Sequence, residues 1–227
     1  MKIGELDVSK IMLGSDEVEK VYLGTEQVYG GSAPPVQTHY ISGTSTASQD
    51  FTIKINLQNE TVSVDANTGD WEITYSGSIT SISAMCKSNM SITSVDLTGI
   101  NYPYIDKEAF QYCSNLSAVT IPEGITVLSG GSFTADWSLV DLHLPSTVTA
   151  IGNNVFGNCS GLTAITIDAM TPPTLGTNTF YNTNNCPINV PCGAYEDYYS
   201  ASTWASYVGR LDEQPCPDPI DNGDDIE

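Results

Sequence analysis

A single apolar pattern recurs along the middle of the chain, and its period constrains the fold more than any other feature. Four phenylalanines mark it, at intervals of 23, 23 and 24 residues: Phe110, Phe133, Phe156 and Phe180. An aliphatic residue stands five positions before each one: Ile105, Leu128, Ile151 and Leu175. A fixed period in the twenties is typical of a solenoid, in which each repeat forms one rung that packs on its neighbours. We therefore expect a stack of rungs here.

Each repeat also carries an apolar triplet after its phenylalanine. In the first repeat the triplet is Leu116, Val119 and Ile121. In the second repeat the triplet is Leu139, Leu142 and Leu144, and in the third it is Leu162, Ile165 and Ile167. This L-x-x-V/I/L-x-I/L spacing predicts the strand of a leucine-rich repeat. An imperfect first rung is expected from Ile79, with Met85, Ile92, Val95 and Leu97 at the Phe, Leu, Val and Ile positions after a slip of one residue.

The unit from Ile151 to Ile167 carries a family resemblance. It reads I-G-x-x-V-F-x-x-C-x-x-L-x-x-I-x-I and resembles the BspA-type leucine-rich repeats of gut and mouth bacteria and of their phages. The repeat of Phe110 keeps Cys113 but has Asp106 in place of the glycine, and the repeat of Phe133 has Asp136 in place of the cysteine. The resemblance implies a binding scaffold, commonly an adhesin, without chemistry of its own.

The flanking segments differ in pattern from the repeats. Residues 36–77 alternate apolar and polar residues, as in Phe51–Ile55, Val62–Val64 and Trp71–Tyr75, which predicts a small antiparallel sheet that caps the open first rung. After the repeats, aromatic residues at helical spacing predict two short helices, separated at Ser202–Thr203, that cover the last rung.

The expected fold class is mainly β, with a leucine-rich-repeat solenoid between two caps. The expected parts are a β-hairpin attachment segment and linker (1–33), a β-sheet cap (34–78), the solenoid (79–192), a helical C-terminal cap (193–211) and an acidic tail (212–227). The tail holds seven acids and three prolines, so by itself it is expected to be disordered.

The first 30 residues contain a shorter repeat, in which the sequence of Lys10–Val18 recurs in similar form at Lys20–Val28. Short apolar runs separated by glycine and a small polar residue predict two successive hairpins, which are marginal alone and so favour a partner. The segment resembles the N-terminal virion attachment pieces of bacteriophage tail and fibre proteins. The residues expected to attach it are Ile11, Leu13, Val18, Val21, Tyr22, Leu23, Val28 and Tyr29. The two resemblances together suggest a protein of a Bacteroides-infecting, crAss-like phage.

Charge and hydropathy exclude several classes of partner. Seven Lys and Arg against 27 Asp and Glu give a net charge of −20, which repels nucleic-acid phosphates and anionic membranes. The sequence lacks a run of about 20 apolar residues, so no membrane insertion is expected. The first residues also lack the apolar core of a secretory signal, which favours a trimmed chain or another route out of the cell.

The six cysteines predict neither a zinc site nor a disulfide framework. Cys113 and Cys159 occupy equivalent positions two rungs apart, on the order of 10 Å at a strand spacing of about 4.8 Å, so we expect two buried thiols. Cys186, Cys192 and Cys216 lie near the C-terminus, and the sequence leaves their pairing open. No metal or cofactor is expected, and no G-x-S-x-G, P-loop or H-E-x-x-H motif points to an enzyme.

One group of outward residues is chemically distinctive. Alternation along the strands sends Asp141 and His143 outward, near Trp137, with Thr120 and Thr166 in the same column as His143. An aromatic ring beside polar groups can seat a sugar, and the alternative is an ordinary solvated face.

Three roles remain open from the sequence. The first is a phage tail or head fibre component that contacts other virion proteins through residues 1–30 and a host-surface glycan or protein through the repeats. The others are a bacterial surface or secreted adhesin and a purely structural virion decoration protein. A homo-oligomer, a trimer by analogy with fibres, is expected in the first role.

Overall fold

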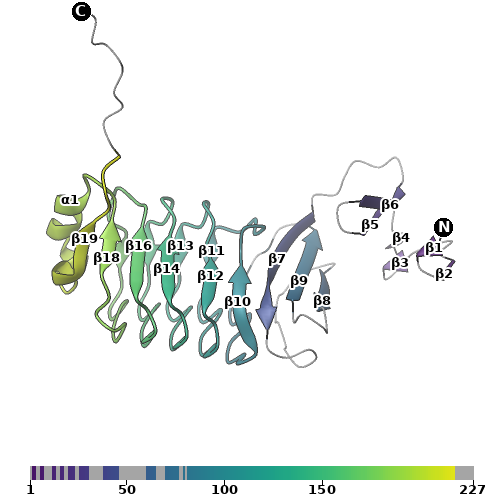
Figure 1. Ribbon diagram of the computed structural model, residues 1–227, viewed down its shortest axis with the longest axis horizontal. Coiled ribbons are helices and arrows are strands. Elements are labelled where there is room, and N and C mark those ends of the chain that lie inside the picture. Colours follow the sequence, from purple (N-terminus) through teal and green to yellow (C-terminus); the bar gives the residue numbers. More distant parts are fainter. Residues whose placement is uncertain are drawn as a thin grey trace, which may run out of the picture. The chain divides into compact units, whose positions relative to one another are not determined.

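The computed structural model contains two compact units, Met1–Gln37 and Thr38–Glu227. The residues it describes are 2–3, 6–7, 12–13, 16–17, 20–23, 26–30, 38–45, 60–64, 70–76, 79 and 81–217. The mainly β fold predicted from the sequence is confirmed, and Figure 1 shows the strands of the second unit as successive rungs.

The N-terminal unit consists of short antiparallel hairpins. They pair β1 (Lys2–Ile3) with β2 (Leu6–Asp7), β3 (Met12–Leu13) with β4 (Asp16–Glu17), and β5 (Lys20–Leu23) with β6 (Glu26–Gly30). The last two pairs are the hairpins expected from the internal repeat, and the first pair was not foreseen. Ile11 and Val18 lie outside the described residues, whereas the expected attachment residues Leu13, Val21, Tyr22, Leu23, Val28 and Tyr29 lie in these strands.

The second unit begins with the expected antiparallel cap. Strand β7 (Thr38–Ser45) pairs with β9 (Asp70–Ser76), which pairs with β8 (Glu60–Val64). The other edge of β7 pairs antiparallel with β10 (Ile92–Asp96), the first strand of the solenoid. The cap therefore hydrogen-bonds to the open edge of the first rung. The expected strand at Phe51–Ile55 lies outside the described residues.

The solenoid is built on two parallel strand ladders. The first, here called the outer ladder, is divided between two sheets. One part pairs β10 with β12 (Ala118–Thr120), and the other pairs β14 (Asp141–Leu144), β16 (Ala164–Ile167) and β18 (Ile188–Val190) in that order. Between the two parts, the amide of Val140 donates to Ser117 O. The second ladder contains β11 (Tyr104–Ile105), β13 (Val127–Leu128), β15 (Ala150–Ile151) and β17 (Thr174–Leu175). Figure 1 shows β10, β12, β14, β16 and β18 one after another along the solenoid.

Turns close each rung and bring the phenylalanine of the repeat into the core. In the rung of Phe156, Asn154 and Asn158 stand two residues before and two after the ring, with φ of 53° and 63°. Asparagine tolerates this left-handed region better than most residues do. In the preceding rung Ala135 takes the place of Asn158, with φ of 64°.

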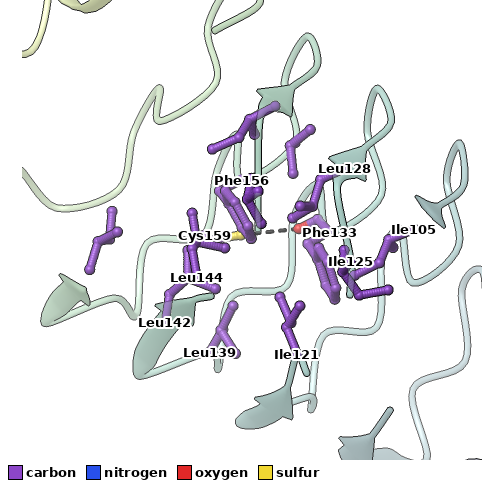
Figure 2. Close-up of a cluster of buried hydrophobic side chains, with 14 of the residues drawn as sticks. Ile105, Ile121, Ile125, Leu128, Phe133, Leu139, Leu142, Leu144, Phe156 and Cys159 are labelled. Atoms are coloured by element: carbon purple, nitrogen blue, oxygen red, sulfur yellow. Dashed lines mark hydrogen bonds between the residues drawn. The ribbon is translucent and has the colours of Figure 1, made fainter. Parts of the chain in front are cut away.

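The four phenylalanines form one continuous stack. The ring centroids of Phe110 and Phe133 lie 5.1 Å apart, those of Phe133 and Phe156 5.5 Å, and those of Phe156 and Phe180 5.8 Å. All four rings are buried. Figure 2 shows the middle of this core, where the Cys159 thiol donates a hydrogen bond to the carbonyl oxygen of Phe133. Burying one such ring contributes about 1.5–3 kcal/mol, so the repeat's most regular position is also a major source of its stability.

The first rung corrects one expectation. Cys86, rather than Met85, occupies the phenylalanine position, because the Cys86 amide donates to Ala109 O as the Phe110 amide donates to Ser132 O. Counted from Cys86, Ile92 stands in register with the other rungs and no slip exists. Met85 is buried in the place of Ala109, one position earlier.

The last rung is covered by short helices and by one further strand. Helix α1 (Tyr195–Ser200) and the 3-10 turns η1 (Ser202–Trp204) and η2 (Val208–Arg210) form the expected helical cap. The expected break at Ser202–Thr203 is wrong, because these residues begin η1 and the break falls at Ala201. Within this cap Trp204 is fully buried against Phe180, with ring centroids 6.0 Å apart, and its indole nitrogen donates to Pro173 O.

The segment expected to begin the acidic tail extends the outer ladder instead. Strand β19 (Leu211–Glu213) pairs in parallel with β18. A disulfide joins Cys192 to Cys216 and fixes the end of this strand, while Cys186 stays free and buried. Cys113 and Cys159 are also free and buried, as expected. Residues 218–227 lie outside the described residues.

Candidate binding surface on the outer ladder

The outward side chains of the rung of Phe133 are held by partners from the next rung. His143 and Asp141 are exposed on β14, whereas Leu142 and Leu144 between and after them are buried. Nε2 of His143 lies 2.5 Å from Oδ2 of Asp168, which follows β16. The sequence analysis did not foresee this partner, because Asp168 lies one residue beyond the recognised strand pattern.

Asp141 is positioned in the same way. Its Oδ1 accepts a hydrogen bond of 3.0 Å from the hydroxyl group of Thr163, at the start of the neighbouring rung's strand segment. This leaves Oδ2 of Asp141 on an exposed residue, available to a ligand. A carboxylate and an imidazole ring on one strand therefore face outward, and each is oriented by a neighbour across the ladder.

Trp137 lies at the corner where the turns lead into β14, and its side chain is 54% exposed. Its backbone is confined by the following rung, because a Cβ added at Gly161 would overlap the carbonyl oxygen of Trp137. Only glycine fits so close to a neighbouring backbone. The exposed indole ring thus stands on a tightly packed support, as a rigid aromatic contact for a ligand requires.

Thr120 and Thr166 lie in the predicted column. Thr166 on β16 stands opposite His143 in the strand register, and Thr120 is exposed on β12. Trp137, Asp141 and His143 belong to one rung, but neither a hydrogen bond nor an ion pair joins Trp137 to the other two within the described part of the chain. The rung brings the three together by position, and the threonines extend the surface to either side.

Three exposed apolar residues were not predicted, and of these Val140 belongs to the same rung as Trp137. Val140, immediately before β14, is 42% exposed, Tyr112 is 46% exposed and Met90 is 62% exposed. Met90 stands four residues after Cys86, as Trp137 stands four after Phe133, so both occupy the same corner. Counting from Cys86 reveals this equivalence in the sequence. We call Trp137, Val140, Asp141 and His143 the Trp137 surface.

The Trp137 surface offers side chains of the kinds that ligand-binding sites use. It offers an indole ring, a small apolar side chain, a carboxylate and an imidazole, with Asp168 adding a second carboxylate behind His143. Its acidic groups favour a neutral or basic ligand over an acidic one. Asp168 and Thr163 orient the imidazole and the carboxylate beside them.

Other sites are less suited to a large ligand. A shallow hollow of about 250 Å³ lies at the opposite end of the strands, lined by Ile100, Asn101, Tyr102, Pro103, Glu123, Gly124 and Ile125. The carboxylate of Glu123 is already engaged there by the amide and hydroxyl groups of Ser146. The described residues contain no cluster of three metal-ligating side chains and no helix long and apolar enough to cross a membrane.

Comparison with known proteins agrees with the geometry of the rungs. Among curated proteins, none matches this chain. The model of the BspA type leucine rich repeat region matches residues 52–163 and 131–198, in six copies. Repeats of this type are typical of surface adhesion and protein-interaction domains, and their solenoids are typically non-catalytic. By its sequence repeat and its ladder of rungs, the chain belongs to the BspA-type leucine-rich repeat family.

Proposed function

We propose that this protein is a binding scaffold that contacts a bacterial-surface glycan or protein through the Trp137 surface. The observation that carries this proposal is the rung of Phe133. It presents an exposed indole beside a carboxylate and an imidazole that are already oriented by Thr163 and Asp168. Binding therefore requires little further ordering of these side chains, which lowers its entropic cost.

We further propose that the scaffold is carried on a phage particle, as a tail or head fibre component. The support is the hairpin segment at residues 1–30, whose L-G-[ST] repeat resembles virion attachment pieces and which forms a compact unit separate from the solenoid. In this role the hairpins contact other virion proteins, and a homo-oligomer, a trimer by analogy with fibres, presents several copies of the surface to the host.

A bacterial surface or secreted adhesin is the second candidate. It is favoured by the usual role of the repeat family and by the disulfide between Cys192 and Cys216, a bond that persists in oxidising surroundings. The disulfide suits an extracellular virion part equally well, so it does not decide between the two roles. A virion decoration protein without a host ligand is a third.

Immunogold labelling with antibodies against this chain separates these roles. The proposal expects label on purified particles, at the tip of a fibre or appendage. Label on the bacterial envelope and none on particles would overturn the virion role in favour of the adhesin. Label restricted to a capsid or collar, together with unchanged host adsorption when the antibody is present, would indicate a decoration protein.

A further inference from the structure

The residue directly before Trp137 is a buried acid in an unusual place. Asp136 stands three positions after Phe133, where the rungs on either side carry Cys113 and Cys159. It is 0% exposed. The rung of Phe180 has Thr183 at this position, also buried. Small, weakly polar groups are thus the rule in this column, and a carboxyl group is the exception.

The surroundings of Asp136 satisfy only half of its carboxyl group. Oδ1 accepts a hydrogen bond of 2.8 Å from the amide of Cys113, whereas Oδ2 has no partner among the described residues. The neighbouring thiols are engaged elsewhere, since Cys113 donates to Cys86 O and Cys159 donates to Phe133 O. Neither thiol therefore compensates the free oxygen.

Within the part of the chain that the structure describes, no basic side chain offers a counter-charge to a carboxylate in this position. The titratable groups that interact with Asp136 are the thiols of Cys86, Cys113 and Cys159, and no basic side chain is among them. Burial raises the pKa of Asp136 well above its usual value, and the amide of Cys113 opposes this only in part. Removing an ion from water without a partner is costly, so the neutral acid is the form that fits the core.

Asp136 is also mechanically connected to the binding surface. Its carbonyl oxygen accepts a hydrogen bond from the amide of Leu139, which closes the turn that carries Trp137. Leu139 is fully buried, so one end of this turn is fixed in the core. The other end of the turn is Asp136 itself, and Trp137 follows it directly in the chain. Moving the Asp136 side chain toward water therefore displaces the turn that holds the indole ring.

We propose that Asp136 is a proton-dependent latch beneath the Trp137 surface. With its proton, Asp136 stays buried and the turn is closed; when it loses the proton, the carboxylate moves toward water and the turn opens. The latch rests on the burial of Asp136 and on its unpaired Oδ2. Its consequence for a ligand, tighter binding in acid than in alkaline solution, rests on the proposed function of that surface.

The direction of the pH effect follows from the raised pKa. An unfolded Asp titrates near pH 3.9, whereas the folded Asp136 holds its proton to higher pH. Between these two pKa values the folded state binds more protons than the unfolded state. Its stability is complete below the unfolded pKa and falls as pH rises, by up to about tenfold in the unfolding equilibrium constant per pH unit, until the folded pKa is passed.

The test compares full-length wild type with Asp136→Asn and Asp136→Thr, the latter taking the residue of the rung of Phe180. Glu196→Gln, at an exposed acid on α1, is the matched control because it also removes one negative charge. Denaturant unfolding is measured from mildly acidic to mildly alkaline pH. The Trp137 indole NMR signal, identified by its loss in Trp137→Phe, is followed over the same range.

The latch predicts that wild type and Glu196→Gln lose stability in parallel as pH rises, while both Asp136 variants lose less. The difference in the unfolding equilibrium constant grows by up to about tenfold per pH unit. It also predicts that the Trp137 signal shifts with pH in wild type and not in the Asp136 variants. An equal pH slope in wild type and in whichever Asp136 variant folds would overturn it. No ligand enters this test, so loss of the latch and loss of the proposed binding function are distinguished.

Discussion

Nε2 of His143 lies 2.5 Å from Oδ2 of Asp168, and this contact joins two successive rungs across the exposed side of the solenoid. The His143 side chain is 65% exposed and that of Asp168 is 38% exposed. Water screens a contact this open, so its role is to orient the imidazole ring more than to stabilise the fold. The pair therefore orients one side chain of the Trp137 surface and contributes little to the core.

A double-mutant cycle on His143 and Asp168 measures this division of roles. We expect His143→Ala, Asp168→Ala and the double variant to give a coupling free energy below about 1 kcal/mol in urea unfolding, because exposed pairs rarely exceed this value. A coupling of several kcal/mol would show that the pair is a structural clamp and would contradict its assignment to the binding surface.

Truncating the middle of the phenylalanine stack has a much larger expected effect. Phe133→Ala removes a buried ring that stacks on both Phe110 and Phe156, so the free energy of unfolding should fall by about 3–5 kcal/mol. Phe133→Leu, which keeps most of the volume, should cost less than half as much. Denaturant unfolding gives both free energies. A small loss of unfolding free energy in both variants would contradict a stabilising role for the phenylalanine stack.

The disulfide between Cys192 and Cys216 predicts a specific response to reductant. It closes a loop with a sequence separation of 24, so reduction should lower the free energy of unfolding by about 2–4 kcal/mol. The double variant Cys192→Ser, Cys216→Ser should melt like reduced wild type and be insensitive to reductant. An equal effect of reductant on that double variant would instead point to Cys86, Cys113, Cys159 or Cys186.

Gly161 packs closely against the backbone of Trp137, so a substitution at Gly161 disturbs that backbone without changing the indole ring. A Cβ at Gly161 would overlap Trp137 O and lie 3.0 Å from Leu139 O, so Gly161→Ala should destabilise the protein by about 1–3 kcal/mol. It should also shift the Trp137 indole signal in NMR spectra. Gly157→Ala is the matched control, because its nearest contact would be an ordinary 3.4 Å. Equal effects of both variants would contradict the support role.

The solenoid could be predicted from the sequence because its core is periodic. Each rung repeats the same phenylalanine, leucine and strand positions, so the pattern at Phe110, Phe133 and Phe156 reports the fold directly. The first rung was aligned one residue out of register in the sequence, because the small Cys86 occupies the position that phenylalanine holds in the other rungs. Strand β19 was not predicted, because a single edge strand with acidic residues does not continue the apolar repeat.

The residues of the Trp137 surface could be predicted from the sequence, whereas their contacts could not. Strand alternation placed Asp141 and His143 outward, but their partners Thr163 and Asp168 lie in a different rung, about one period away in sequence. The pairing of Cys192 with Cys216 was open for the same reason, since spacing alone does not determine which thiols meet. Neighbouring rungs supply these partners, and only the stacked structure shows them.

The most direct test of the account is binding of the full-length protein to host cells and to a glycan array. Wild type is compared with the combined variant Trp137→Ala, Asp141→Ala, His143→Ala and with Tyr181→Ala, a control at an exposed aromatic residue outside the Trp137 surface. The account predicts that the combined variant loses at least about tenfold in affinity, as for a binding hot spot, while Tyr181→Ala binds like wild type. Unchanged binding of a correctly folded combined variant would contradict it.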